Sequence, residues 1–164
     1  MNRLLTIAVV LLLMPLAAFA ETAWKTYVNP RFGFKLAYPA ELKLKEEPTN
    51  GQGREFYSVD KEFHMAAYAH FLIDEDSLEK RWQEELADLG NAITYKKKDK
   101  SWYVVSGVKD GQEFYHRTHV KDKNWATFRI TYPHAKAKQY DPWVEKVAKS
   151  FVPFLKGDYD RIEK

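Results

Sequence analysis

The stretch Ser101-Trp-Tyr-Val-Val-Ser-Gly-Val-Lys109, then Asp110-Gly111, then Gln112-Glu-Phe-Tyr-His-Arg-Thr-His-Val-Lys121 decides the fold. Both runs are rich in β-branched and aromatic residues, which is typical of strands. An Asp-Gly pair between two such runs predicts a hairpin, because a type I′ turn needs positive φ angles that these two residues tolerate. Further turn residues at 98–100 and 122–124 extend the hairpin into a four-stranded antiparallel meander from Ala92 to Tyr132.

The turns also predict which residues share a face of the sheet. A two-residue turn at Asp110-Gly111 sets Val104 opposite Arg117, and residues directly opposite one another lie on the same face. A short turn after Val120 sets Arg117 opposite Phe128, and a two-residue turn at Asp99-Lys100 sets Tyr95 opposite Val104 and Ile93 opposite Ser106. One face then collects most of the apolar side chains, and we expect it to face the core: Ile93, Tyr95, Trp102, Val104, Val108, Tyr115, Ala126, Phe128, Ile130 and Tyr132.

The opposite face is mixed, and it carries the polar cluster that we single out. The register sets His116 opposite Arg129, with Tyr103 on the same face. An imidazole beside a guanidinium favours a carboxylate or a phosphate, so Tyr103, His116 and Arg129 are a candidate binding cluster. The alternative is structural: His116 hydrogen-bonds beneath a helix or loop, and Arg129 pairs with a surface carboxylate.

The rest of the chain supplies a hairpin, further strands and two helices. Tyr27 to Pro39 is predicted to form a strand, a turn and a strand, and Arg54 to Ile73 two more strands. A first helix is predicted from an N-cap at Asp76 to Leu89, with Gly90 just beyond its end. A second is predicted to open at Asp141, with Pro142 at its first position. This order predicts an α+β fold, an α/β/α sandwich around a central antiparallel sheet of about six strands.

Residues 1–20 have the pattern of a signal peptide. A short positive start precedes the apolar run from Leu4 to Leu13, and Ala18-Phe19-Ala20 is an A-x-A cleavage site. We expect cleavage after Ala20, a periplasmic or secreted mature protein and no stable membrane insertion afterwards; an uncleaved anchor is the alternative. The predicted organisation is a signal peptide at 1–20, one domain at 21–155 and a charged tail at 156–164.

Composition excludes several classes of function. The chain has no cysteine, so it holds no disulfide, thiol nucleophile or thiolate metal site. Its 26 basic and 23 acidic side chains are interspersed, which indicates a solvated surface rather than a nucleic-acid footprint. The basic run Lys96 to Lys98 is interpreted as protection of an exposed strand edge.

The N-terminal motif Tyr27-x-Asn29-Pro30-x-x-Gly33-Phe34-x-x-x-Tyr38-Pro39, together with a closing helix that leads into Ser150-Phe151, resembles the PsbP-like family. The type member of that family is an extrinsic lumenal subunit of photosystem II, and small exported bacterial proteins carry similar patterns. The resemblance covers nearly the whole mature chain and implies an α/β/α sandwich. It also implies an accessory or binding role rather than catalysis, but no family ligand or partner contact can be matched to residues here.

Metal and catalytic sites find little support in the spacing of the histidines. His116 and His119 are three residues apart on a predicted strand and so lie on opposite faces, while His64 and His70 lie about 20 Å apart along a strand. We therefore expect no metal and no cofactor. Ser106 could pair with His119 on the core face, but no G-x-S-x-G elbow surrounds it.

We therefore expect a small exported, non-catalytic binding or accessory protein of the cell envelope. Its partner is expected to be an envelope protein or a small anionic ligand. The alternative is a periplasmic hydrolase that uses His116 or His119.

Overall fold

The predicted meander forms one half of a seven-stranded antiparallel sheet in the computed structural model, which describes residues 22–73 and 76–155. The strand order is β3-β4-β5-β9-β8-β7-β6, and a separate two-stranded sheet, β1-β2, comes from the N-terminal motif. The fold is α+β, as predicted, with seven strands in the main sheet rather than about six. The elements in chain order are β1 (Trp24–Val28), β2 (Lys35–Pro39), β3 (Lys43–Leu44), β4 (Gly53–Tyr57), β5 (His64–Phe71), α1 (Leu78–Leu89), β6 (Ile93–Lys98), β7 (Trp102–Lys109), β8 (Gln112–Lys121), β9 (Asn124–Pro133) and α2 (Ala137–Ser150), with short 3-10 turns at Gly90–Ala92 and His134–Lys136.

The turn between β7 and β8 has the predicted geometry. Asp110 has a φ of 51° and Gly111 a φ of 75°, the two positive angles that a type I′ turn requires. The predicted pairs of β7 with β8 and of β8 with β9 are confirmed, including Val104 opposite Arg117 and Arg117 opposite Phe128. The Asp-Gly signal therefore determines the register of β7 with β8, and the short turn at 122–123 determines that of β8 with β9.

The predicted register of β6 is wrong. Tyr95 pairs with Ser106 rather than with Val104, and Ile93 pairs with Gly107 rather than with Ser106. The turn before β7 is longer than two residues, and a bulge between Ile93 and Tyr95 shifts the start of the strand. As a result Ile93 moves to the opposite face, while Tyr95 stays on its predicted face but is largely exposed.

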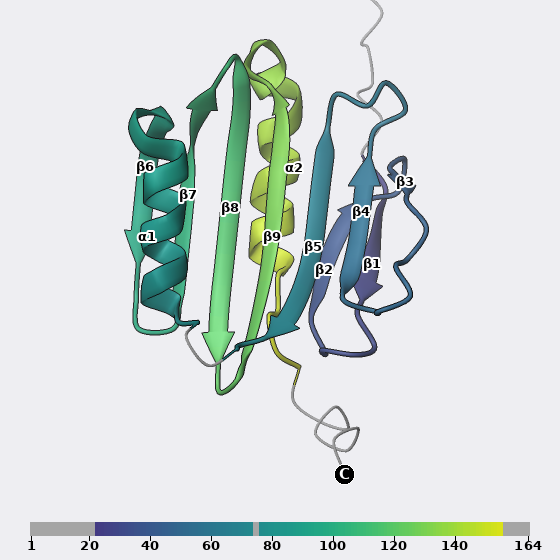
Figure 1. Cartoon of the computed structure of the whole chain (residues 1–164). Helices are drawn as coiled ribbons and strands as arrows, with labels where there is room; N and C mark the ends of the chain where they lie inside the picture. The colour runs from purple at the N-terminus through teal and green to yellow at the C-terminus, as the bar shows by residue number, and fades with distance from the viewer. Residues whose placement is uncertain (1–21, 74–75, 156–164) are drawn as a thin grey trace, which may run out of the picture.

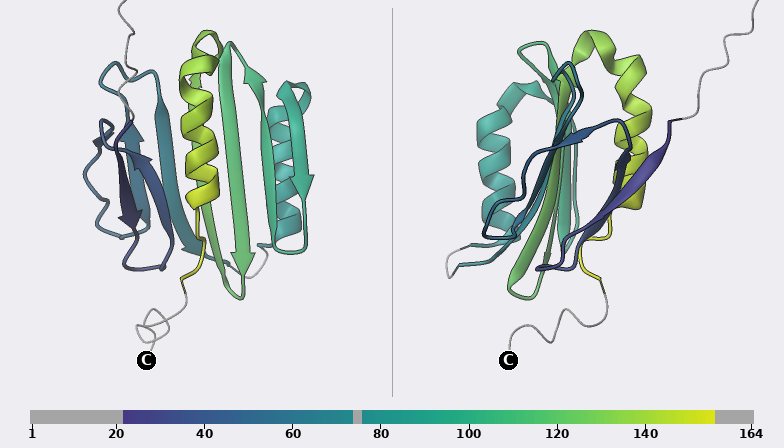
Figure 2. Two further views of the ribbon diagram at one scale, coloured as in Figure 1. Left: turned by 180° about the vertical axis from the view of Figure 1, so that it is seen from behind. Right: turned by 90° about the vertical axis from the view of Figure 1, so that its right-hand side faces the viewer.

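Two layers flank the sheet on opposite sides (Figure 1, Figure 2). Helix α1 lies over β6 and β7 on one face, called the α1 face below. Helix α2 and the β1-β2 hairpin lie on the other face, called the α2 face, and Lys35 of β2 forms a bridge with Val152 just after α2. The sheet is therefore sandwiched as predicted, but each helix covers only part of its own face.

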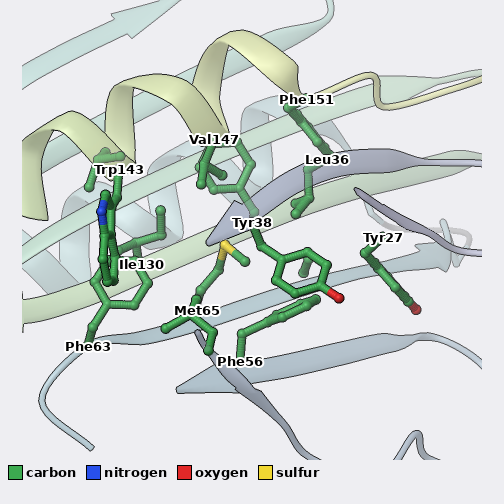
Figure 3. Close-up of a cluster of buried hydrophobic side chains, with 14 of the residues drawn as sticks. Tyr27, Leu36, Tyr38, Phe56, Phe63, Met65, Ile130, Trp143, Val147 and Phe151 are labelled. Carbon is green, nitrogen blue, oxygen red and sulfur yellow. The ribbon is translucent and has the colours of Figure 1, made fainter. Parts of the chain in front are cut away.

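The main core lies between the sheet and the layer of α2 and the hairpin (Figure 3). Alternation on β2 and β5 directs one set of side chains inward, as the period-2 pattern predicts. Phe63, which directly precedes β5, contacts Trp143 of α2 with ring centroids 5.3 Å apart, and Phe151 packs on Phe128 with centroids 5.0 Å apart. The fully buried members include Phe34, Leu36, Phe56, Phe63, Met65, Ala67, Phe128, Ile130 and Val147.

A smaller core lies beneath α1. Trp82 and Leu89 of the helix pack on Tyr103, Val105 and Phe114 of the α1 face. Four partly buried apolar residues pack against the same cluster: Leu78, Leu86, Ala92 and Ile93. The apolar stripe that helical periodicity predicts for α1, made of Leu78, Trp82, Leu86 and Leu89, therefore faces the sheet.

Both helices begin at residues other than those predicted. The N-cap of α1 is Ser77, whose side chain accepts a hydrogen bond from the backbone of Lys80, whereas Asp76 pairs with the Arg81 side chain. Helix α2 begins at Ala137, so Pro142 lies inside the helix rather than at its first position. Tertiary packing of the first turn of α2 outweighs the hydrogen bond that proline removes.

The predicted signal peptide, its cleavage site after Ala20 and the charged tail from 156 lie outside the described residues. Within residues 22–73 and 76–155, no helix is both long and apolar enough to cross a membrane.

Candidate functional site

The three predicted cluster residues lie on the α1 face at the border of the area that α1 covers. His116 of β8 is directly opposite Arg129 of β9, and Ala66 of β5 continues the row beyond Arg129. Tyr103 of β7 lies in the neighbouring row, opposite Thr118. The register thus brings the three side chains to one region of one face, as predicted.

A fourth residue, Glu85 of α1, joins His116 to Arg129. Its carboxylate accepts a hydrogen bond from His116 Nδ1, with 3.0 Å between Nδ1 and Oε2, and its other oxygen pairs with the Arg129 guanidinium. Glu85 is 6% exposed, whereas the Arg129 side chain is 43% exposed. A buried carboxylate held by two bases anchors α1 to the sheet.

Glu85 is not among the residues that the sequence analysis predicts for this cluster. It lies three residues after Trp82 and four before Leu89, the two other buried residues of α1. That spacing puts it within the apolar stripe, which was the signal available in the sequence.

The environment sets the ionisation of this cluster. Burial alone would raise the pKa of Glu85, but the hydrogen bond from His116 and the charge of Arg129 outweigh burial and hold that pKa below its ordinary value. Burial raises the pKa of Tyr103 to about 12, so its hydroxyl stays protonated. The cluster therefore presents an ionised carboxylate and a neutral phenol at neutral pH.

Two clefts lie beside Arg129. The first, about 180 Å³, runs under the edge of α1 and includes Arg129, Tyr103 and Glu85 in its lining. The second, about 290 Å³, is lined by residues of β4 and β5. In Figure 1 these two strands lie on the half of the α1 face that α1 does not cover. The lining of this second cleft, called the β4-β5 cleft, includes Lys45, Gln52, Glu55, Ala66, Tyr68 and His70.

The charges around the β4-β5 cleft are partly neutralised within the protein. Glu55 on its floor pairs with Lys45 at 3.0 Å and with His64 at 3.2 Å, and the hydrogen bonds from these two bases lower the pKa of Glu55. Burial, together with the nearby charges of Arg81 and Arg31, lowers the pKa of His70. At neutral pH the aromatic wall made by Tyr68 and His70 is therefore uncharged.

The geometry gives no support to the hydrolase alternative. His119 Nε2 accepts a hydrogen bond from Arg117 at 3.0 Å, and burial and the Arg117 charge lower the pKa of His119 to about 4. Ser106 pairs with Tyr115, which is four residues, or about 13 Å, along β8 from His119. Among the hydrogen bonds of the described residues, none joins a serine or threonine hydroxyl to a histidine ring.

A metal centre has no donor set in the part of the chain that the structure describes. No group of three or more histidine, aspartate or glutamate side chains converges there in a geometry that could hold an ion. The pairs His116 with Glu85 and His64 with Glu55 each lack a third donor of that kind.

Comparison with solved structures places the fold. The solution structure of cyanobacterial PsbP (CyanoP) from Synechocystis sp. PCC 6803 superposes with a TM-score of 0.59 over 87% of this chain and 99% of that one, at 12% sequence identity. The fold is PsbP-like. A crystal structure from Bacteroides thetaiotaomicron VPI-5482 also matches, with a TM-score of 0.52 and 15% identity over 82% of this chain and half of the other.

No family model matches the sequence, and a search of curated proteins gives no significant match. At 12% and 15% identity the two structural matches establish the PsbP-like fold alone, because one fold hosts many functions. The predicted resemblance is thus confirmed as a likeness of fold, and function has to be argued from the surface of this chain.

Proposed function

We propose that the mature chain is a small exported, non-catalytic accessory protein of the cell envelope that binds a small organic anion on the open half of the α1 face. The ring or apolar part of the ligand lies in the β4-β5 cleft, and its acidic group meets Arg129. The observation that carries this proposal is the position of half-exposed Arg129, which lines the cleft under α1 and lies directly opposite Ala66, a lining residue of the β4-β5 cleft with its aromatic wall.

Arg129 keeps binding capacity despite its pairing with Glu85. The pairing engages Nη2, and the other guanidinium nitrogens have no hydrogen-bond partner among the described residues. Because a guanidinium presents five donors in a fixed fork, the free side can bind a carboxylate or phosphate with two hydrogen bonds. Glu85 thus orients Arg129 without using up its donors.

The β4-β5 cleft suits the remainder of such a ligand. Ala66 lies between Glu55 and Arg129 in the cross-strand row, and its small side chain leaves a hollow between the two charged residues. Tyr68 and His70 supply flat aromatic surface beside it. A volume of about 290 Å³ lies at the lower end of the range for small-molecule sites, so the ligand is the size of one or two rings.

Export is the second part of the proposal. It is supported by the charged start, the apolar run and the A-x-A site that end at Ala20. Mass spectrometry of the protein from an envelope fraction tests it directly: the expected N-terminus is Glu21, and a retained Met1 would contradict cleavage.

The binding test uses amide NMR of the mature chain titrated with benzoate, and with benzamide as the neutral analogue. We expect benzoate to shift the amides of Ala66, Tyr68 and Arg129, and benzamide to do so more weakly. Arg129→Gln should remove the preference for benzoate, whereas Lys25→Gln, an exposed change on β1, should not. If benzoate at millimolar concentration shifts none of these three amide resonances, the proposed ligand site is wrong.

A further inference from the structure

The α2 face also has an uncovered half, at the corner diagonally opposite the β4-β5 cleft. Helix α2 lies over β9, and the view from behind shows β8, β7 and β6 open beside it (Figure 2). Cross-strand pairing places Lys97, Val104 and Arg117 in one row of this half. We call it the β6-β8 surface, made of Tyr95, Lys97, Trp102, Val104, Val108, Tyr115 and Arg117.

Aromatic and aliphatic side chains are concentrated on the β6-β8 surface. Tyr95 is 52% exposed, Trp102 and Tyr115 are half-buried, and Val104 is buried. An apolar groove of about 240 Å³ runs between Tyr115 and α2. This is the face whose alternating pattern predicts a core, and the chain's own helix stops short of it. An apolar face left open in this way is typical of a docking surface.

The charges on the β6-β8 surface are positive and lack acidic partners within residues 22–73 and 76–155. The Lys97 ammonium lies 5.7 Å from the Trp102 ring centroid, and the Arg117 guanidinium lies 5.2 Å from it. Among the ion pairs of the described residues, neither cation pairs with a carboxylate, whereas the bordering Glu113 and Glu145 pair with His134 and Lys149. The net field over the apolar patch therefore attracts an acidic partner.

The same corner holds a free strand edge. β6 is the last strand of the sheet, so the backbone groups along its outer side face no neighbouring strand. Lys96, Lys97 and Lys98 occupy this edge and are exposed. Antiparallel pairing of two copies along β6 would bring these like charges together, which disfavours a second copy as the occupant. An acidic strand would meet Lys96 and Lys97 favourably, whereas Lys98 already pairs with Glu79 of α1.

We propose that the β6-β8 surface docks an acidic, extended segment of a partner protein. The segment adds to the sheet along β6, lays its apolar side chains on Trp102 and Tyr115, and sets carboxylates against Lys97 and Arg117. Strand addition supplies main-chain hydrogen bonds, while alternate side chains supply specificity. This surface is distinct from the Arg129 site and goes beyond the function proposed above.

The test uses a synthetic decapeptide of alternating Glu and Val or Tyr residues, with a Lys-for-Glu version of the same peptide as the charge control. In amide NMR of the mature chain, we expect the acidic peptide to shift β6 and β7 and to slow amide exchange along β6. The basic peptide should have no effect. Because the contact is electrostatic in part, its affinity should fall as salt is raised.

Two variants on one strand separate docking from simple charge attraction. Lys97→Glu and Lys96→Glu make the same change in net charge, but Lys97 pairs with Val104 on the α2 face and Lys96 with Val105 on the α1 face. We expect Lys97→Glu to weaken peptide binding by about tenfold, and Lys96→Glu clearly less. Thermal unfolding of both variants checks that each is folded.

Several outcomes overturn the proposal. An equal loss in both variants shows non-specific attraction, and shifts confined to the Arg129 region place the peptide on the other site. Concentration-dependent dimerisation that Tyr95→Ser abolishes assigns the surface to a second copy. An acidic peptide that shifts no residue of β6 or β7 shows that the surface does not take such a segment.

Discussion

Replacing Glu85 tests whether the buried carboxylate holds α1 on the sheet. Glu85→Ala removes the hydrogen bond from His116 and the pairing with Arg129 together. A hydrogen bond between a buried carboxylate and an imidazole is worth about 1.5–3 kcal/mol. The pairing with Arg129 adds about 0–1 kcal/mol, because that side chain is 43% exposed and water screens it. We therefore expect Glu85→Ala to lower the free energy of unfolding by about 2–4 kcal/mol.

The conservative variant Glu85→Gln should cost less, about 1–2 kcal/mol, because the amide oxygen can still accept one of the two hydrogen bonds. The assay is urea unfolding of the mature chain at pH 7, followed by circular dichroism, with Glu84→Gln as the matched control. Glu84 is the exposed neighbour on the same helix, so its change should stay within about 0.5 kcal/mol.

The pH dependence of the same variants gives a second readout. Since the folded state lowers the pKa of Glu85, its contribution to stability is present above the unfolded value of about 4.5 and is lost as the pH falls through the lower folded value. The difference between wild type and Glu85→Gln should therefore be full at pH 7 and shrink below about pH 4.5. Urea midpoints of both Glu85 variants that match wild type at pH 7 would refute the anchoring role.

Three further changes test other parts of the structure. Burial and a neighbouring guanidinium lower the pKa of His119 from 6.5 to about 4. Neutral His119 therefore contributes about 2 kcal/mol to the free energy of unfolding, after allowing for partial exposure, and this contribution is full above pH 6.5 and is lost as the pH falls toward 4. His119→Phe should make the free energy of unfolding depend less on pH over that range. Gly107→Ala sets a Cβ 1.9 Å from the carbonyl oxygen of Ala92, so the melting temperature should drop sharply; an unchanged value contradicts that approach. Ser77→Ala should lower the free energy of unfolding by about 1 kcal/mol because it removes the N-cap of α1, and an unchanged value would contradict that cap.

The register of β7, β8 and β9 was predictable because two short turns determine it locally. Asp110 and Gly111 adopt the two positive φ angles of the turn between β7 and β8. Because side chains alternate with a period of two, the register set at each turn then holds along the whole length of the paired strands. β6 was not predictable in the same way. The turn between β6 and β7 has no Asp-Gly pair. The bulge in β6 lies beside a tertiary contact, the close approach of the Ala92 carbonyl to Gly107.

The candidate site was only partly predictable for a related reason. Pairing along the strands placed His116 opposite Arg129, because that relation depends on local turns. The partner that joins them comes from α1, 31 residues before His116, and its position depends on how the helix docks. Helical spacing predicts that Trp82, Glu85 and Leu89 share the face of α1 that packs on the sheet, but the strands on which that face lies are decided by tertiary packing.

The size of the sheet explains why both faces keep an open half. Seven strands span about 29 Å at their usual spacing, whereas one helix with its side chains is about 10–12 Å wide. Helix α1 lies toward the β6 edge, and α2 with the hairpin lies toward the β3 edge on the other face, so the open halves fall at opposite corners (Figure 2). Two surfaces so placed share no side chain and can be occupied at the same time.

This arrangement predicts that the two sites act independently. Arg129→Gln should weaken benzoate and leave the acidic peptide unaffected, and Lys97→Glu should do the reverse, because changes at well-separated sites add. In a titration with both probes present, each should keep the affinity it has alone. The two sites are nevertheless joined through the sheet, because Arg129 of β9 pairs with His116 of β8, and β8 also carries Tyr115 and Arg117 of the β6-β8 surface. If benzoate changes the affinity for the peptide, the sheet itself transmits the effect, and the two surfaces then belong to one regulated binding function rather than to two separate ones.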